Sequence, residues 1–146
     1  MDLLDSLPRL VKPGGTFDAD RATAYHEMGH CLIILRHGYY PSRVTLDPPG
    51  TYFRYRGIAP NFALMLHMGG PAAQAIYSGI YGWSEGDRRH LKRVMSRHNI
   101  SSLELVRVWA ETHVELLNHW EWVALMASRL YDNKELDKRY FTNLMT

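Results

Sequence analysis

The feature that most constrains this chain is the H-E-x-x-H string formed by His26, Glu27 and His30. In a helix, residues i and i+4 leave the same face one turn apart, so both imidazoles can bind one zinc ion. Glu27 directly follows the first histidine and is expected to lie beside the metal, where it can accept a proton from a water molecule that the metal activates. The string predicts a helix that carries the ligands and the general base of a zinc peptidase.

The residues around this string predict that the helix is buried. The segment is apolar on more than one side, through Ala22, Ala24, Tyr25, Met28, Leu32, Ile33 and Ile34. Buried histidines and glutamates need partners, because an unpaired buried polar group costs about 1–3 kcal/mol, and a metal would supply them. Gly29 lowers helix stability by roughly 1 kcal/mol relative to alanine, so it indicates that another backbone approaches closely there.

Length and composition favour one globular domain without nucleic-acid or membrane partners. The chain has 146 residues, 46% of them hydrophobic, and a formal net charge of +2, which is too small to indicate nucleic acid binding. Its apolar runs are shorter than the roughly 20 residues that span a bilayer, and no signal-peptide pattern is present, so we expect a soluble, cytoplasmic protein. Cys31 is the single cysteine, so a metal site must rest on histidine and carboxylate ligands.

A basic cluster runs from Arg88 to His98. We expect it to form the solvated face of a helix, because no aromatic residues that could stack on bases are interleaved with it. A nucleic-acid-associated regulator is the alternative function that this cluster would serve.

Capping and turn signals predict the order of the elements. A first helix is expected from Asp18 or Asp20 to Arg36 or His37, followed by a hairpin whose strands are 43–46 and 52–56. A second helix is expected over 60–78. At Gly69-Gly70-Pro71 we expect a kink or a close crossing against the first helix, which carries the predicted metal ligands and is called the metal helix.

Three further caps predict the second half of the chain. Ser84 is expected to begin a helix that runs to about His98, Ser101 a long amphipathic helix to Tyr131, and Asp137 a short last helix. The predicted fold is therefore mainly α, with a small β-hairpin between the metal helix and the second helix. Residues 1–15 are expected to form an arm, and residues 16–146 a single domain.

Three segments resemble the zinc peptidase domain of the FtsH-type AAA proteases, especially its stand-alone phage-like and bacterial relatives. Thr23–His30 is similar to the family's T-A-Y-H-E-A-G-H signature, and Gly69–Gly79 to its G-G-x-A-A-E-E helix. Leu116–Leu144 looks like the family's closing pattern of a long helix, a tight break, a leucine and a terminal helix. The resemblance implies a helical zincin-like peptidase domain. This chain has no phosphate-binding G-x-x-x-x-G-K-[ST] loop, so we expect the domain to act without ATP.

The resemblance also implies an aspartate as third zinc ligand, near the start of the helix that follows the glycine-rich segment. Asp87 is the better candidate, because it is a carboxylate at a helix N-terminus after Gly86. An ungapped alignment instead places His90 opposite the family's aspartate. The predicted set is His26, His30 and Asp87 around zinc, with His90 as the competing third ligand.

The predicted function is a zinc metalloendopeptidase that cleaves peptides or unfolded proteins, with Glu27 as general base. The alternative is a catalytically silent zinc-binding interaction or regulatory module. Gln74 and Ala75 stand where the family carries two acidic residues, which favours this alternative. His67 is a candidate for binding a substrate carbonyl, and the sequence leaves open whether the protein forms a homo-oligomer.

Overall fold

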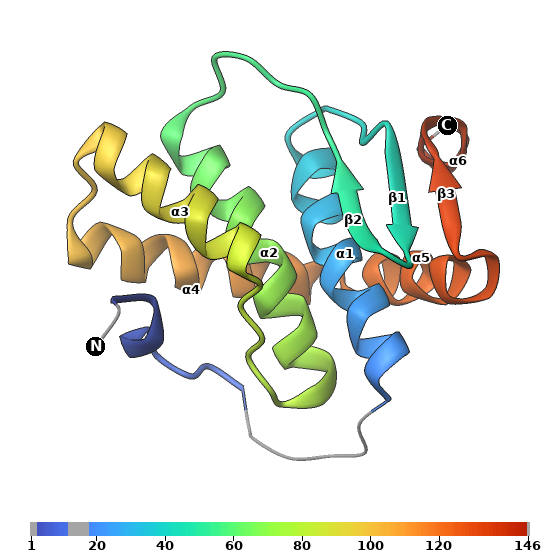
Figure 1. The fold of residues 1–146 in the computed structure, drawn as a ribbon, viewed down its shortest axis with the longest axis horizontal. Helices are drawn as coiled ribbons and strands as arrows, with labels where there is room; N and C mark the ends of the chain where they lie inside the picture. The colour runs from blue at the N-terminus through green and yellow to red at the C-terminus, as the bar shows by residue number, and fades with distance from the viewer. Residues whose placement is uncertain (1–2, 12–17, 146) are drawn as a thin grey trace.

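The computed structural model describes residues 3–11 and 18–145 (Figure 1). It is mainly α-helical, as predicted. Its elements, in chain order, are η1 (Leu3–Ser6), α1 (Ala19–Arg36), β1 (Arg43–Leu46), β2 (Pro49–Tyr52), α2 (Pro60–Ser78), α3 (Glu85–His98), α4 (Ser102–Asn118), α5 (Trp120–Asn133), β3 (Glu135–Asp137) and α6 (Lys138–Leu144).

Helix α1 lies in the interior of the molecule and packs against α2, α5 and the sheet (Figure 1). The side chain of Asp18 caps it by accepting a hydrogen bond from the amide of Arg21 at 3.0 Å. Every residue from His26 to Leu35 is buried, so the apolar surroundings of the H-E-x-x-H string form the core as predicted. The helix ends at Arg36, and Gly38 follows in the left-handed conformation at φ 84°.

Helices α1 and α2 cross in backbone contact at Gly29 and Gly69. A methyl group added at Gly29 would overlap the carbonyl oxygen of Gly69 and lie 2.6 Å from Cβ of Ala73. One added at Gly69 would lie 2.6 Å from the carbonyl oxygen of Gly29. The predicted close crossing is therefore present, and α2 continues through Pro71 to Ser78.

The predicted hairpin is present, but its second strand was wrongly placed at Tyr52–Arg56. The strand is Pro49–Tyr52, and it pairs antiparallel with β1 in a register that sets Arg43 opposite Tyr52 and Leu46 opposite Pro49. Among the described strands, β2 has a neighbour on one side only, and a proline without an amide donor is tolerated on such an edge. The turn therefore uses two residues, and the strand begins earlier than the β-favouring residues suggested.

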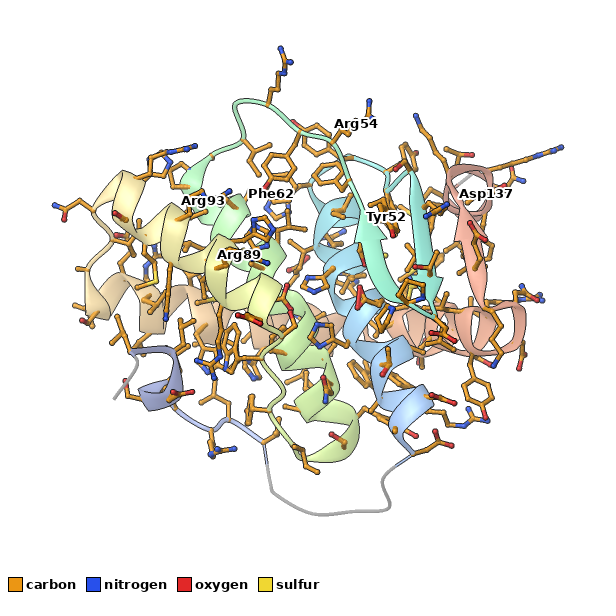
Figure 2. All side chains as sticks on the ribbon, viewed as in Figure 1. Tyr52, Arg54, Phe62, Arg89, Arg93 and Asp137 are labelled. Atoms are coloured by element: carbon orange, nitrogen blue, oxygen red, sulfur yellow. The ribbon has the colours of Figure 1, made fainter. Side chains whose placement is uncertain are left out.

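A third strand, absent from the prediction, completes the sheet in the order β2-β1-β3. Leu136 of β3 is buried and pairs with Val44 of β1. Figure 2 shows Asp137 on β3 on the far side of β1 from Tyr52. The strand has only three residues, and it lies beside β1 because the preceding helix α5 ends there.

The single long helix predicted from Ser101 to Tyr131 is wrong, because the chain breaks at His119 into α4 and α5. Helix α4 packs against α2, whereas α5 packs against α1, so the break lets consecutive segments cover two different helices. The predicted caps are confirmed: the side chains of Ser84, Ser101 and Asp137 each accept a backbone amide hydrogen bond at 3.0–3.1 Å.

The described part of the N-terminal segment packs on α4 through buried Leu4 and Leu7, and the carbonyl of Pro8 accepts a hydrogen bond from Nε1 of Trp109 at 2.7 Å. The remainder of the predicted 1–15 arm, residues 1–2 and 12–15, lies outside the described residues. Within the described ranges, no helix has the length and apolarity needed to cross a membrane.

Candidate metal centre

Three predicted ligand side chains meet between α1 and the N-terminus of α3. Nε2 of His26 lies 2.9 Å from Oδ2 of Asp87, and Nε2 of His30 lies 3.4 Å from Oδ1 of Asp87. All three side chains are buried, and their candidate ligand atoms lie within 4.8 Å of one another. In the part of the chain that the structure describes, this is the one group of three or more such side chains close enough to hold a metal ion.

Both histidines are oriented by hydrogen bonds at their other ring nitrogen. Nδ1 of His26 donates to Oε1 of Gln74 at 2.9 Å, and Nδ1 of His30 donates to the carbonyl of Leu66 at 2.6 Å. These bonds hold each ring with its Nε2 facing Asp87, the usual orientation of metal-binding histidines. Gln74 thus supports His26 with a neutral amide.

Gly70 keeps the space beside the two histidines open. A methyl group added there would overlap Nε2 of His30 and lie 2.7 Å from Nε2 of His26. The sequence predicted a helix crossing from Gly69-Gly70-Pro71, which Gly69 provides, but it did not reveal the separate role of Gly70. The pair of adjacent glycines could have revealed it, because one glycine is enough for a single backbone contact and the second therefore needs another reason.

The buried charges strongly perturb one another. Burial alone would raise the pKa of Asp87, but the nearby His30 and His26 hold it well below its ordinary range. Burial alone would lower the pKa of His30, but the Asp87 carboxylate, with help from Glu27 and the Leu66 carbonyl, raises it to about 9. His30 is therefore protonated at neutral pH in the metal-free protein, and a bound metal cation would displace that proton.

Glu27 lies next to this cluster and has a different partner. Its side chain is buried, and Oε1 accepts a hydrogen bond from Oγ1 of Thr51 on β2 at 2.9 Å. Thr51 also donates to the backbone carbonyl of Glu27 at 3.3 Å. Thr51 was missed in the sequence analysis, because the predicted second strand began one residue after it.

An open cavity of about 480 Å³ contains the cluster and Glu27. Its walls come from α1, β2 with the following loop, α2 and the start of α3; they include Pro49, Gly50, Thr51, Phe53, Tyr55, Leu66, His67, Ser84 and Gly86. We call this cavity the metal cleft. It gives a ligand from solvent access to buried histidine and carboxylate groups.

His90, the competing third ligand, does not join the cluster. It is exposed, and its ring stacks on that of His67 with centroids 5.0 Å apart. His67 lines the metal cleft, and its Nε2 is buried without a hydrogen-bond partner among the described residues. Burial, followed by the charges of His30 and His90, lowers the pKa of His67 to about 4, so its ring is neutral at pH 7.

The chemistry of these donors fits a catalytic zinc ion. Two imidazole nitrogens and one carboxylate are a frequent ligand set of catalytic zinc, with a further position left for water or substrate. The two Nδ1 hydrogen bonds and the space beside Gly70 orient the ligand atoms toward one point. No protein-family model matches the chain, and no curated protein matches it significantly.

Proposed function

We propose that this chain is a zinc-dependent metalloendopeptidase similar to the peptidase domain of FtsH-type proteases. The observation that carries the proposal is the meeting of His26, His30 and Asp87 in a cleft that also contains the buried carboxylate of Glu27. A site that only binds a metal needs no more than the three ligands. Peptide hydrolysis also needs a general base beside the metal, and Glu27 is placed to be that base. A cytoplasmic location and independence from ATP belong to the same proposal.

In this mechanism, His26, His30 and Asp87 would hold the metal, and Glu27 would move the proton. A bound zinc ion would supply a Lewis acid that polarises the scissile carbonyl and lowers the pKa of water toward about 7. Glu27 accepts a proton from the attacking water and delivers it to the leaving amine. The Thr51 hydroxyl, at 2.9 Å, holds the Glu27 carboxylate in place between these two transfers.

The substrate would bind as an extended strand along β2. This strand is at the edge of the sheet, and Pro49–Thr51 also line the metal cleft. Backbone pairing at an open edge gives affinity with little sequence preference, which suits an unfolded polypeptide. The scissile bond would then lie between β2 and the cluster on α1 and α3.

The substitution Glu27→Gln tests the proposal. It should preserve the fold and one zinc per chain, because Glu27 is not among the ligands, while kcat for a casein or peptide-library substrate falls by about 10²–10⁴-fold with loss of the base. Metal content by atomic emission and cleavage by mass spectrometry provide the two measurements. Full turnover in this variant, or loss of its zinc, would show that the assigned role is wrong.

The alternative function is a silent zinc-binding module. The neutral amide of Gln74 at His26 favours it, because an amide raises the basicity of the ligand less than a carboxylate does. One zinc per wild-type chain, together with no cleavage of any library peptide, would support this alternative and reject the peptidase.

A further inference from the structure

A second cavity, of about 440 Å³, adjoins the metal cleft. Tyr55, His67 and His90 line both cavities, so the two meet at these three side chains. The second cavity then continues between the β2–α2 loop and the exposed side of α3. A chain bound in the metal cleft could therefore extend directly into it.

The charged side chains that line this second cavity differ from those of the metal cleft. The walls of the second cavity carry Arg56 from the loop and Arg93 and Arg97 from α3, and none of the described residues that line it has a carboxylate. The metal cleft contains Glu27 and Asp87. We call the second cavity the basic cavity.

Two arginines of the basic cavity have no ion-pair partner among the described residues. Arg93 and Arg97 are exposed and one turn apart on α3, and neither forms an ion pair with a described carboxylate, whereas Arg36 and Arg107 do, each at 2.6 Å. Figure 2 shows Arg93 on α3. Arg93 and Arg97 therefore keep guanidinium donors available to a ligand in the cavity.

We propose that the basic cavity binds a carboxylate of the peptide substrate, so that preferred substrates carry an acidic group at a constant position on one side of the scissile bond. This inference rests on the proposed peptidase function. A guanidinium group binds a carboxylate through two parallel hydrogen bonds, and three arginines around one cavity provide several such donors. The acidic group can be a Glu or Asp side chain or the free C-terminus of the substrate.

An acidic peptide fits better than a nucleic acid. The basic cavity leads into the metal cleft, whose described lining residues include no arginine or lysine that could contact a phosphate backbone continuing along the same path. Tyr55 is the only aromatic residue of Phe, Tyr or Trp type among the described lining residues, so the cavity lacks a row of rings for base stacking.

Binding to the zinc-loaded Glu27→Gln protein tests the inference without requiring turnover. Fluorescent peptides of one sequence would carry either Glu or Gln at the positions flanking a central apolar residue, each with a free or an amidated C-terminus. We expect at least one carboxylate-bearing peptide to bind about tenfold tighter than the amidated Gln peptide at low salt, and the preference to shrink as salt rises. The free and amidated versions separate a C-terminal from a side-chain carboxylate.

The added substitutions Arg93→Gln and Arg97→Gln should reduce this preference to about twofold or less. The matched control carries Arg129→Gln and Arg139→Gln, which remove the same charge from exposed positions on α5 and α6, outside both cavities. The control should keep the full preference. Equal binding of all four peptides, or an equal loss of preference in the control, would overturn the inference. A competition experiment gives a third test: the inference is also overturned if a short single-stranded oligonucleotide displaces the bound acidic peptide at a lower concentration than unlabelled acidic peptide does.

Cleavage by the wild-type protein separates this inference from the proposed function. Cut sites in a peptide library should lie at a fixed distance from an acidic group, on one side only. Acid-selective binding that depends on Arg93 and Arg97, without cleavage of any peptide, would reject the peptidase and keep the basic cavity as a carboxylate-binding site. Cleavage without selection for acidic groups would keep the peptidase and reject the inference.

Discussion

At the scale of single residues, Asp87 and His90 separate two versions of the metal site. Asp87 is buried against both histidines, whereas His90 is exposed and stacks on His67. Asp87→Asn should therefore weaken zinc binding by about 100-fold or more, while His90→Ala changes it by less than about threefold. Competition with a chromophoric chelator measures both affinities, and the reverse order would identify His90 as the ligand.

The proton held by His30 predicts a pH dependence of metal binding. With a pKa raised from 6.5 to about 9, His30 is protonated at neutral pH in the metal-free protein, and zinc must displace that proton. Zinc affinity should therefore rise about tenfold per pH unit between pH 7 and 9 and level off above. In the metal-free protein the same interaction stabilises the fold fully below pH 6.5 and is lost as the pH rises through about 9.

Calorimetric titration with zinc at pH 7.5, in buffers of different ionisation enthalpy, gives the number of protons released. We expect about one for the wild type and a smaller number for Asp87→Asn, because this substitution removes the charge that raises the pKa of His30. Release that is zero in the wild type, or unchanged in Asp87→Asn, would contradict the assignment.

At the scale of elements, the crossing of α1 and α2 positions His26 and His30 relative to Asp87. Gly29→Ala should lower the free energy of unfolding by about 1–3 kcal/mol, because the added methyl group overlaps the Gly69 carbonyl and the backbones must separate. Urea unfolding of the metal-free protein provides the measurement. Gly86→Ala in α3 is the matched control.

An added methyl group at Gly86 would have no neighbour closer than 3.9 Å, so this control should be neutral or gain up to about 1 kcal/mol from helix propensity. Equal stability of the two variants would show that α1 and α2 do not require the contact at Gly29. Reduced zinc affinity in Gly29→Ala would show in addition that the crossing aligns the ligands.

At the scale of the whole molecule, a bound zinc would connect α1 to α3, two helices that both pack on α2. A ligand that binds only the folded state stabilises it by about 4 kcal/mol at a free concentration of 1,000 times its Kd. Removal of zinc with a chelator should therefore lower the Tm by roughly 10 °C for a domain of this size. Differential scanning calorimetry measures the shift, and in His26→Ala the chelator should leave the Tm unchanged.

Local chemistry was sufficient to predict the metal helix, because capping and the i, i+4 spacing of His26 and His30 depend only on neighbours within two turns. The other three caps and the span of α2 were predicted for the same reason. The break at His119 and the strand Glu135–Asp137 were missed. Each depends on a partner far away in the sequence: α4 and α5 pack against different helices, and β3 pairs with β1. Their own residues carry little information about those partners.

Tertiary structure alone decided which residues complete the site. Sequence spacing left Asp87 and His90 as alternatives, and only the packing of α3 on α2 buries the first and exposes the second. Thr51 and Gln74 reach Glu27 and His26 from elements 24 and 48 residues away along the chain. A sequence motif can specify the chemistry of one helix, but the partners of that chemistry come from segments that meet it only when the core is formed.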